Sequence, residues 1–426
     1  MSLKINKYLL GTAFAAGLLV GLPFQCGFAQ SYNVVDLGTP GGSTNLGSYS
    51  AAHGINSSGA VTGEWSPNST SQRAFLYNGT TNSDLGLLTG MLYESGHAIN
   101  SSNLVVGAAE NDFGAFRAFL YTNGTLVDLT TFTQTVGNYT YSIAHSINAA
   151  GKVVGESFIS SALNSEIHAV IFLGNHQQTD LGTLTNGTYS SAYGINNSNV
   201  IVGESTVSSG DVYAFIYSNA TMTSLGGLPG GNYSAAFAIN DAGQIAGEAA
   251  DSSGETHAFL YKNGAMTDLG TLGGTNSSAA AINRVGTVVG YALTADGNQH
   301  AFLYDGTTIL DLNNLISSAV CTNLVSADGI NDAGQITGSG YTTNGIYHAF
   351  LLTPAVTLTA SPGLTNGKFM LTVQGAPGQH FAIQASTNFV NWTSLNTNTL
   401  VSASTNWLDA DVPTNNYRFY RAVMLP

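Results

Sequence analysis

The chain contains little charge, cysteine, proline and tryptophan. Charged residues make up 8% of its 426 residues, and it has 2 Cys, 9 Pro and 3 Trp. Its formal net charge of -14 opposes a polyanionic partner, so we expect neither nucleic acid binding nor attachment to an anionic membrane surface. No CxxC pair and no Cys/His spacing of the zinc-binding type occurs, which excludes a structural zinc site built on cysteine ligands.

Glycine and apolar residues are abundant instead. The chain has 51 Gly and is 43% hydrophobic, which is unlike a disordered polar sequence. No segment shows helical periodicity after the N-terminus, and Gly, Asn, Ser and Thr separate short apolar runs. We therefore predict a β-rich globular protein.

The first 29 residues have the pattern of a secretory signal peptide. Lys4 and Lys7 precede an apolar run over 8–24, and Gly27 and Ala29 occupy the small-residue positions before a cleavage point. No second run of membrane-spanning length follows. We expect an exported protein without membrane insertion, extracellular or on the cell surface, with the periplasm as an alternative.

Cleavage at this point would remove one of the two cysteines. Cys26 lies within the segment, which leaves Cys321 as the only cysteine of the mature chain. No intrachain disulfide is then expected, and we predict that Cys321 is a small buried residue.

A small residue followed by Ile-Asn recurs seven times. The spacing between successive asparagines is 44, 48, 48, 44, 43 and 48 residues. Such a period indicates a repeat architecture. The asparagines are Asn56, Asn100, Asn148, Asn196, Asn240, Asn283 and Asn331.

Each anchor is followed by the same strand and turn signals. The third residue after the asparagine is Gly or Asn, the two residues that best tolerate a left-handed backbone, so a hairpin turn is predicted there. A "VVG"-type strand, a loop, a run such as "HAFLY", a short turn and a strand ending in "DLG" come next. Each repeat therefore predicts four strands.

Seven four-strand units predict an all-β fold, a seven-bladed β-propeller over residues 30–354. The last repeat ends after "HAFLL" without a "DLG" strand, whereas "SYNVVDLG" over 31–38 precedes the first anchor. The N-terminal strand is therefore expected to complete the seventh blade and close the ring. Val34 and Leu37 should then be buried against the "HAFLL" blade.

The pattern "AIN…G.VVG…HAFLY.NG…DLGTLGG" resembles the HAF family of probable extracellular repeat proteins of bacteria. The resemblance covers about residues 31–354. It implies a secreted β-propeller-like repeat protein, and the family carries no established activity.

The first residue of the "HAFLY" run is predicted to be structural. Arginine, histidine and tyrosine alternate at this position and share no single catalytic chemistry. The same holds for the aspartate of "DLG", which recurs in nearly every repeat. The position holds Arg73, Arg117, His168, Tyr213, His257, His300 and His348.

Two other positions are candidates for ligand binding. The first, two residues before each Ile-Asn isoleucine, holds His53, His97 and His145 in consecutive repeats, and three imidazoles could bind a metal if they converge. The alternative is packing between blades, because Tyr193 and Phe237 share the position.

The second candidate position follows the "VVG" glycine. Four glutamates there could form an acidic rim that binds a cation or a sugar, or act in glycosidase chemistry; the alternative is a solvated strand end. The stretches "DSSG" at Asp251 and "DGN" at Asp296 have residues that bind calcium in other loops, but the chain has no D-x-D-x-D-G run and turn chemistry explains both. We therefore assign no metal, no cofactor and no catalytic residue. The four glutamates are Glu64, Glu156, Glu204 and Glu248.

Residues 355–426 lack the repeat and alternate as strands do, which predicts a small C-terminal immunoglobulin/fibronectin-like β-sandwich with Trp392 in its core. The stretches "IQAS…NW" and "RFYRA" resemble the C-terminal module of secreted proteins from Verrucomicrobia-like bacteria.

The blades carry no large insertion of the kind that builds a catalytic lid. We therefore expect an exported, non-enzymatic, monomeric recognition or scaffold protein that binds an extracellular glycan or a surface protein. The alternatives are a polysaccharide lyase or hydrolase acting at the propeller mouth and a structural component of a matrix or surface layer.

Overall fold

The computed structural model is all-β and forms two compact units, Val34–Leu352 and Met1–Asn33 with Thr353–Pro426. It describes residues 3–6, 32–42, 47–68, 71–132, 140–162, 165–316, 320–365, 368–375, 380–387, 390–401, 404–409 and 417–424. The predicted signal peptide and Cys26 lie outside these residues, apart from the short strand β1 (Leu3–Asn6). Within the described residues, none of the helices has the length and apolar character needed to cross a membrane.

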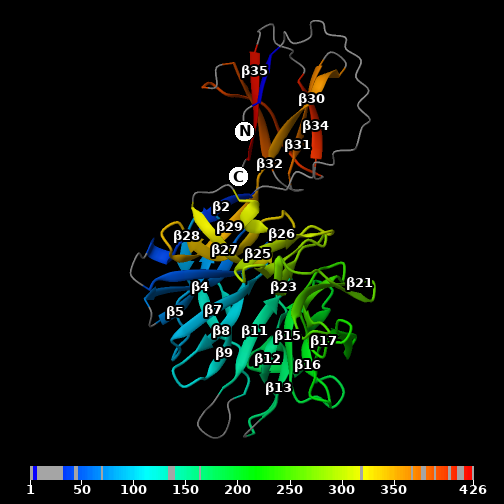
Figure 1. The fold of residues 1–426 in the computed structure, drawn as a ribbon. Helices are drawn as coiled ribbons and strands as arrows, with labels where there is room; N and C mark the ends of the chain where they lie inside the picture. Colours follow the sequence, from blue (N-terminus) through cyan, green and yellow to red (C-terminus); the bar gives the residue numbers. More distant parts are fainter. Residues whose placement is uncertain are drawn as a thin grey trace. The chain divides into compact units, whose positions relative to one another are not determined.

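The first unit consists of repeated four-stranded antiparallel sheets consistent with β-propeller blades (Figure 1). The prediction of repeated four-strand units is thus confirmed. In every sheet of this unit except the last, the strands follow one another in chain order, and a single bridge pair, Gln72 with Tyr93, joins the first two sheets. The last sheet has the order β2-β29-β28-β27 and so takes one strand from the N-terminal side of the chain.

The first strand of each sheet ends at the isoleucine of the repeat. These strands are β3 (Tyr49–Ile55), β7 (Tyr93–Ile99), β11 (Ser142–Ile147), β15 (Ser190–Ile195), β19 (Ser234–Ile239), β23 (Gly273–Ile282) and β27 (Cys321–Ile330). The second strands carry the "VVG" motif. They are β4 (Val61–Asn68), β8 (Val105–Glu110), β12 (Val153–Phe158), β16 (Ile201–Thr206), β20 (Ile245–Ala250), β24 (Val288–Thr294) and β28 (Ile336–Thr342).

The third strands carry the "HAFLY" motif. They are β5 (Ser71–Tyr77), β9 (Phe116–Thr122), β13 (Ile167–Gly174), β17 (Val212–Ser218), β21 (Thr256–Lys262), β25 (Gln299–Tyr304) and β29 (Tyr347–Pro354). The fourth strands are short. They are β6 (Asn82–Asp84), β10 (Thr125–Asp128), β14 (Gln177–Asp180), β18 (Thr221–Gly226), β22 (Ala265–Asp268), β26 (Ile309–Asp311) and β2 (Tyr32–Asp36), with the 3₁₀ turns η1 (Pro40–Gly42) and η2 (Leu312–Asn314) between repeats.

The Ile-Asn turns form as the sequence predicts. The side-chain oxygen of Asn56 accepts hydrogen bonds from the backbone N–H groups of Ser58 and Ala60, at 3.0 Å each. The third residue after the asparagine has a positive φ in every repeat, for example 82° at Gly59 and 59° at Asn103. Both residue types accept this conformation at low cost, which explains why the position holds nothing else.

A β-bulge interrupts the first strand of every sheet. In β15 the register shifts between Ala192 and Gly194, which leaves Tyr193 unpaired with β16. Opposite the bulge stands the "VVG" glycine, Gly203, where a Cβ would lie only 1.8 Å from the backbone oxygen of Ser191. A bulge changes the direction of a side chain. The bulged residues are His53, His97, His145, Tyr193, Phe237, Ala280 and Asp328.

The hydrophobic core lies between neighbouring sheets. One cluster joins Val202 and Ala214 of one sheet to Ala236, Ile245 and Phe259 of the next. A strand covered on both faces needs a continuous apolar run, which is what the "AFLY" motif provides. The motif phenylalanines with no solvent exposure are Phe75, Phe119, Phe215, Phe259, Phe302 and Phe350.

Buried serines connect five of the sheets to a neighbouring sheet. The hydroxyl of Ser234 accepts a hydrogen bond from the backbone N–H of Ala214 at 2.8 Å and donates to the backbone oxygen of Gly226 at 2.6 Å. These bonds satisfy buried backbone groups where two sheets meet. The serines at this position are Ser50, Ser142, Ser190, Ser234 and Ser277.

In the second repeat Glu94 replaces this serine. It has no solvent exposure, and its Oε1 accepts a hydrogen bond from the Leu88 N–H, while Oε2 has no hydrogen-bond partner among the described residues. Burial raises the pKa of Glu94 to about 7, so the folded state keeps a proton that the unfolded state releases near pH 4.5. The free energy of unfolding contributed by this group should therefore fall as pH rises from about 4.5 to above 7.

Replacing Glu94 by glutamine (E94Q) should remove this pH dependence. At pH 8 the variant should be more stable than the natural chain by on the order of 2 kcal/mol, with little difference at pH 4. Urea unfolding across this pH range measures the effect, and E110Q on the same sheet is the matched control. Parallel stability curves for E94Q and the natural chain would show that Glu94 titrates normally.

The N-terminal strand β2 is hydrogen-bonded to β29, although the two lie about 312 residues apart. The Leu37 N–H donates to the Ala349 oxygen at 2.9 Å, and the Asp36 carboxylate is 2.9 Å from Nδ1 of His348. Leu37 is buried as predicted, but Val34 is only half-buried. Tyr32 is the most deeply buried residue of this strand, at 2% exposed. Side chains alternate along a strand, so Tyr32 and Val34 share the inner face and Val35 lies on the exposed one.

Cys321, at the start of β27, is buried as predicted. Burial raises the pKa of its thiol to about 11, so the thiol stays protonated at neutral pH. A protonated, buried thiol is a poor nucleophile.

The second unit contains two sheets. One has the order β1-β35-β32-β33, with β35 (Tyr417–Met424), β32 (His380–Ser386) and β33 (Thr393–Thr399); the other is β30 (Thr357–Thr365), β31 (Lys368–Gln374) and β34 (Ser404–Asp409). Leu371 and Phe381, from different sheets, share one core cluster. The prediction for Trp392 is wrong: it is half-buried beneath the Arg421 guanidinium, 4.3 Å away, and Trp407 packs against the core instead.

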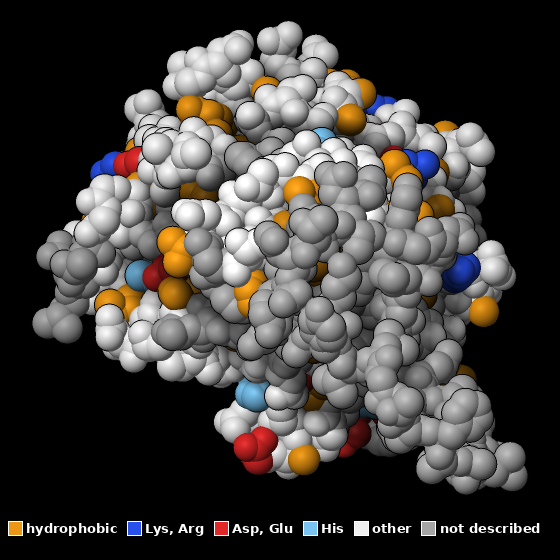
Figure 2. All heavy atoms as spheres, turned by 90° about the horizontal axis from the view of Figure 1, so that it is seen from above, with side chains coloured by type: hydrophobic (Ala, Val, Ile, Leu, Met, Phe, Trp, Pro, Cys, Tyr) orange, Lys and Arg blue, Asp and Glu red, His pale blue; other side chains and the backbone are white. Residues whose placement is uncertain are grey.

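Among the described residues visible in Figure 2, basic and acidic side chains are scattered between uncharged atoms. This agrees with a chain that has only 10 Lys and Arg and 24 Asp and Glu.

Candidate functional site

The bulged residues of neighbouring sheets meet one another. The ring centroids of His53 and His97 are 6.4 Å apart, those of His97 and His145 5.6 Å, and His145 lies 5.0 Å from Tyr193, which lies 5.4 Å from Phe237. The three histidines are thus brought together as the sequence suggested. They form one row of neighbouring rings with Tyr193 and Phe237, as expected if the residues at this position pack between the blades.

The histidines do not form a ready metal site. The rings of His97 and His145 are stacked at 14°, so their nitrogen lone pairs do not converge, and Nδ1 of His97 is bonded to the Ala144 oxygen at 2.9 Å. Burial, followed by the nearby imidazoles of His145 and His53, lowers the pKa of His97 to about 3. His97 is therefore neutral at physiological pH, and its Nδ1 carries the proton.

His53 forms an ion pair with a glutamate. Its Nε2 is 3.5 Å from Glu64. Burial alone would lower the pKa of His53, but the hydrogen bond and charge of Glu64 outweigh it and raise the pKa. Burial likewise opposes ionisation of Glu64, yet the bond to His53 dominates and lowers the pKa of Glu64.

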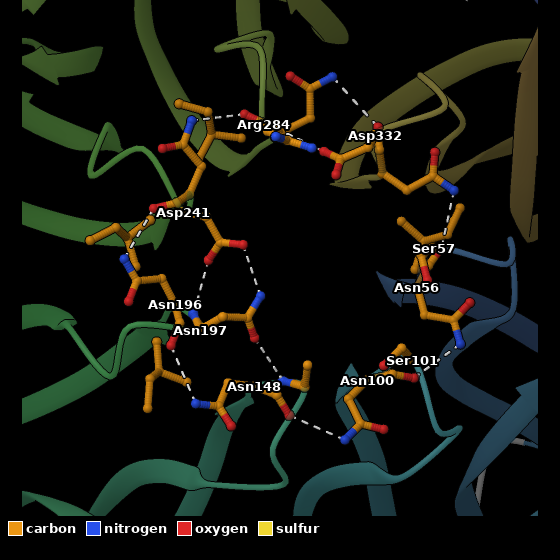
Figure 3. A pocket seen from close by; sticks show the side chains of 18 of the residues that line it. Asn56, Ser57, Asn100, Ser101, Asn148, Asn196, Asn197, Asp241, Arg284 and Asp332 are labelled. Atoms are coloured by element: carbon orange, nitrogen blue, oxygen red, sulfur yellow. Dashed lines mark hydrogen bonds between the residues drawn. The ribbon is translucent and has the colours of Figure 1, made fainter. Parts of the chain in front are cut away.

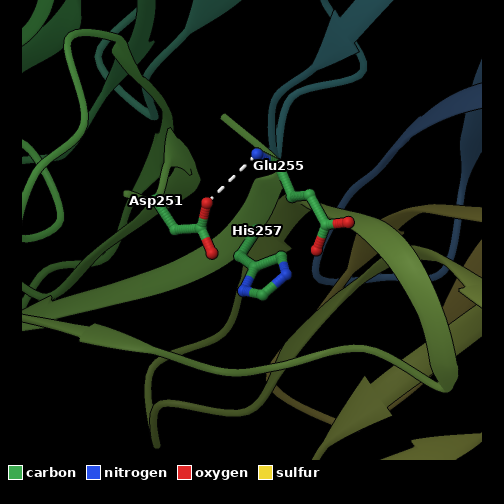
Figure 4. A group of neighbouring side chains, drawn as sticks. All are labelled: Asp251, Glu255 and His257. Atoms are coloured by element: carbon green, nitrogen blue, oxygen red, sulfur yellow. Dashed lines mark hydrogen bonds between the residues drawn. The ribbon is translucent and has the colours of Figure 1, made fainter. Parts of the chain in front are cut away.

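Within the described residues one group of three potential metal ligands lies close together. Figure 4 shows Asp251, Glu255 and His257 around the hairpin from β20 to β21, with their ligand atoms within 4.8 Å of one another. Asp251 accepts hydrogen bonds from the Ser253 and Glu255 N–H groups, and His257 is bonded to Asp268. Turn formation and strand pairing account for the group.

Three of the four candidate glutamates accept hydrogen bonds from tyrosines, whereas Glu64 accepts one from Gln72 at 2.8 Å. Tyr141 and Tyr189 donate to Glu156 at 2.8 and 3.0 Å, and Tyr193 donates to Glu204 at 2.8 Å. Tyr233 donates in the same way to Glu248, at 2.8 Å. We call this set the glutamate–tyrosine cluster: Glu156, Glu204, Glu248, Tyr141, Tyr189, Tyr193 and Tyr233.

The alternative of a solvated strand end does not hold for these glutamates. Glu156 is 4% exposed, and Glu204 and Glu248 are half-buried. Sequence reasoning missed their tyrosine partners, although a signal existed: a tyrosine stands four residues before the bulge in five repeats. Those tyrosines are Tyr49, Tyr93, Tyr141, Tyr189 and Tyr233.

Two neighbouring carboxyl groups of the cluster differ in acidity. Burial opposes ionisation of Glu156, but the nearby His145 imidazole, 3.9 Å away, and the hydrogen bonds from Tyr141 and Tyr189 outweigh it and lower the pKa of Glu156. For Glu204 burial comes first, and with the charges of Glu156 and Glu248 it outweighs the Tyr193 bond and raises the pKa. The cluster thus combines a carboxylate, a more readily protonated carboxyl group and several phenol rings.

The Ile-Asn turns lie at the other end of the first strands and surround a cavity of about 290 Å³, which we call the axial cavity (Figure 3). The side-chain amide of each asparagine donates to the backbone oxygen of the next anchor asparagine, for example Asn56 to Asn100 at 3.0 Å. The last one, Asn331, donates to the oxygen of Asn56 at 3.0 Å. The seven hydrogen bonds therefore return to their starting turn.

The histidines of the "HAFLY" motif are structural, as predicted. Nδ1 of His257 is 2.8 Å from Asp268, which also accepts a hydrogen bond from the Gly270 N–H at 2.7 Å. The aspartate of "DLG" thus shapes its own turn and ties the fourth strand to the third. The other pairs are His168–Asp180, His300–Asp311, His348–Asp36, Arg73–Asp84 and Arg117–Asp128.

No protein family model and no curated protein matches the chain. A solved puromycin hydrolase in complex with PGG is similar at a TM-score of 0.48 and 11% identity, over 79% of this chain and 59% of that one, so the match spans less than two thirds of the hydrolase. TolB from Acinetobacter baumannii gives a TM-score of 0.37 at 12% identity, covering 74% of this chain and 77% of that one. A fungal lectin from Aleuria aurantia, a six-bladed β-propeller, gives 0.31 at 8% identity, covering 88% and 96%.

Similarity at this level implies no shared activity. The matched proteins are β-propellers that include both enzymes and lectins. The resemblance of this chain to the HAF family stays a prediction.

Proposed function

We propose that the unit Val34–Leu352 is a closed seven-bladed β-propeller whose seventh blade is completed by β2. Three observations support the proposal. β2 pairs with β29, the first strand of each sheet contacts that of the next with β27 contacting β3, and the asparagine hydrogen bonds return from Asn331 to Asn56. Closure removes the exposed sheet edges that an open array would leave.

On this scaffold we propose an exported, non-enzymatic recognition protein that binds an extracellular polysaccharide. The glutamate–tyrosine cluster is the observation that carries the proposal. Half-buried phenol rings offer apolar faces to a sugar ring, and carboxylates accept hydrogen bonds from its hydroxyl groups. Export rests on the N-terminal segment with Lys4 and Lys7.

Affinity electrophoresis on a panel of neutral and acidic polysaccharides, preceded by a glycan array, tests this function. E204Q and Y189F should each weaken binding about tenfold, because a charge-assisted hydrogen bond contributes about 1.5–3 kcal/mol. E255Q and Y217F, which change the same residue types outside the cluster, are the controls. If the variants and the controls weaken binding equally, the glutamate–tyrosine cluster is not part of the binding site.

One observation favours an enzyme as second candidate. The pKa of Glu156 is lowered and that of Glu204 raised, and carboxyl groups with opposed pKa shifts carry out acid–base cleavage of glycosides. If the chain releases reducing ends or unsaturated sugars from a polysaccharide, and E204Q does not, the chain is a hydrolase or lyase and not a recognition protein. If neither binding nor turnover is detected, a structural role in a matrix or surface layer is the remaining candidate.

A further inference from the structure

Isoleucine side chains give the axial cavity an apolar wall. The isoleucine before each anchor asparagine lines it, and the exposed fractions of Ile99, Ile195 and Ile282 are only 7%, 8% and 9%. The asparagine amides are occupied by their turns and by the neighbouring repeats. They therefore shape the cavity, and its recognition chemistry must come from other residues.

The residue after each anchor asparagine differs between repeats and sets the charge at the rim of the cavity. Of the described residues that line it, Arg284 is the one lysine or arginine, and Asp241 and Asp332 belong to the two adjacent repeats. The Asp241 carboxylate accepts two hydrogen bonds from Asn197, and Asp332 accepts one from the Arg284 backbone N–H. Among the described residues the Arg284 guanidinium has no hydrogen-bond or ion-pair partner of its own.

These charges select against simple ions. An anion drawn to Arg284 also meets the two flanking carboxylates, and a cation drawn to them meets the guanidinium. A dipolar molecule that places a carboxylate at Arg284 and an ammonium group at Asp332 or Asp241 satisfies both signs. Specificity of this kind comes from rejecting the wrong charge as well as attracting the right one.

From this arrangement we infer that the axial cavity is a second binding site, for a free α-amino acid with an aliphatic or aromatic side chain. The carboxylate of the amino acid pairs with Arg284, its ammonium group with Asp332 or Asp241, and its side chain lies against the isoleucine wall. A volume of about 290 Å³ is at the small end of ligand pockets and holds one such molecule rather than an oligosaccharide.

Isothermal titration of the full chain with four probes tests the inference. L-Leucine has both charges and an apolar body, 4-methylpentanoate lacks the ammonium group, leucinamide lacks the carboxylate, and glycine lacks the apolar body. L-Leucine should bind at least about tenfold more tightly than each of the others. Equal binding of 4-methylpentanoate, or no binding of L-leucine and L-phenylalanine up to their solubility limits, would overturn the inference.

Two variants locate the site. R284Q should weaken L-leucine binding about tenfold and reduce its advantage over leucinamide, and D332N should reduce its advantage over 4-methylpentanoate. K262Q, which removes an exposed cation elsewhere, is the control and should bind as the natural chain does. Unchanged affinity in R284Q would place binding outside the cavity. The site is independent of the glutamate–tyrosine cluster, so E204Q should bind L-leucine normally whatever its effect on polysaccharide.

Discussion

Deleting residues 31–38 is expected to lower the free energy of unfolding by about 4 kcal/mol or more. Leu37 belongs to a core cluster that contains Ala349 of β29 together with Val61 and Phe75 of the first repeat. The deletion removes this side chain, breaks the Asp36–His348 pair and leaves the N–H and C=O groups of β29 without partners. Urea and thermal unfolding of a chain that begins at residue 39, compared with a chain that begins at residue 30, measure the loss.

The matched comparison is a chain that ends at Pro354 and so lacks residues 355–426. It should keep a single cooperative transition for the repeat unit, because each core cluster of that unit is built from its own residues. If the N-terminal deletion unfolds like the intact chain, the completion of the seventh blade by β2 and the closed ring are both wrong. An open array of sheets would then be the better description.

Replacing Gly203 by alanine (G203A) should cost about 3 kcal/mol, and the same change at any other "VVG" glycine should cost a similar amount. The added Cβ would lie 1.8 Å from the Ser191 oxygen and 2.9 Å from the Phe215 ring. Both neighbours are fixed, one as backbone and the other as a fully buried core residue. The bulge at Tyr193 must therefore open, which displaces Tyr193 from Glu204.

G227A is the control for this substitution. A Cβ at Gly227 would meet its nearest neighbours at 3.7–3.9 Å, which is ordinary contact, so the stability should change by less than about 0.5 kcal/mol. Thermal unfolding compares the two variants, and near-ultraviolet circular dichroism reports the tyrosine environment. Equal stabilities for G203A and G227A would show that the glycine is not required by the bulge.

The local chemistry of the repeat could be predicted from the sequence because it depends on residues a few positions apart. The left-handed residue at Gly59 and Asn103, the Asn56 turn and the structural role of His257 all follow from short-range patterns and their recurrence. Recurrence also argued against a catalytic role for His257, since a single active site does not need one copy per repeat.

The partners of the candidate residues could not be predicted in the same way. Tyr189 bonds to Glu156, 33 residues away, and Asn56 to the Asn100 backbone, 44 residues away. Which groups meet depends on the bulge that turns residues such as His53 and Tyr193 out of the strand register, and a bulge leaves little trace in the order of residue types.

The sequence by itself determined the all-β class, the four-strand repeat and its turns, because alternation, turn residues and their recurrence are properties of neighbours along the chain. Tertiary structure alone decided that His97 and His145 stack instead of converging on a metal, and that Glu156 and Glu204 differ in acidity. It also decided that the Arg284 guanidinium stands beside a cavity with no partner among the described residues. The physical reason is that burial and charge proximity arise between sheets, where residues tens or hundreds of positions apart share one space.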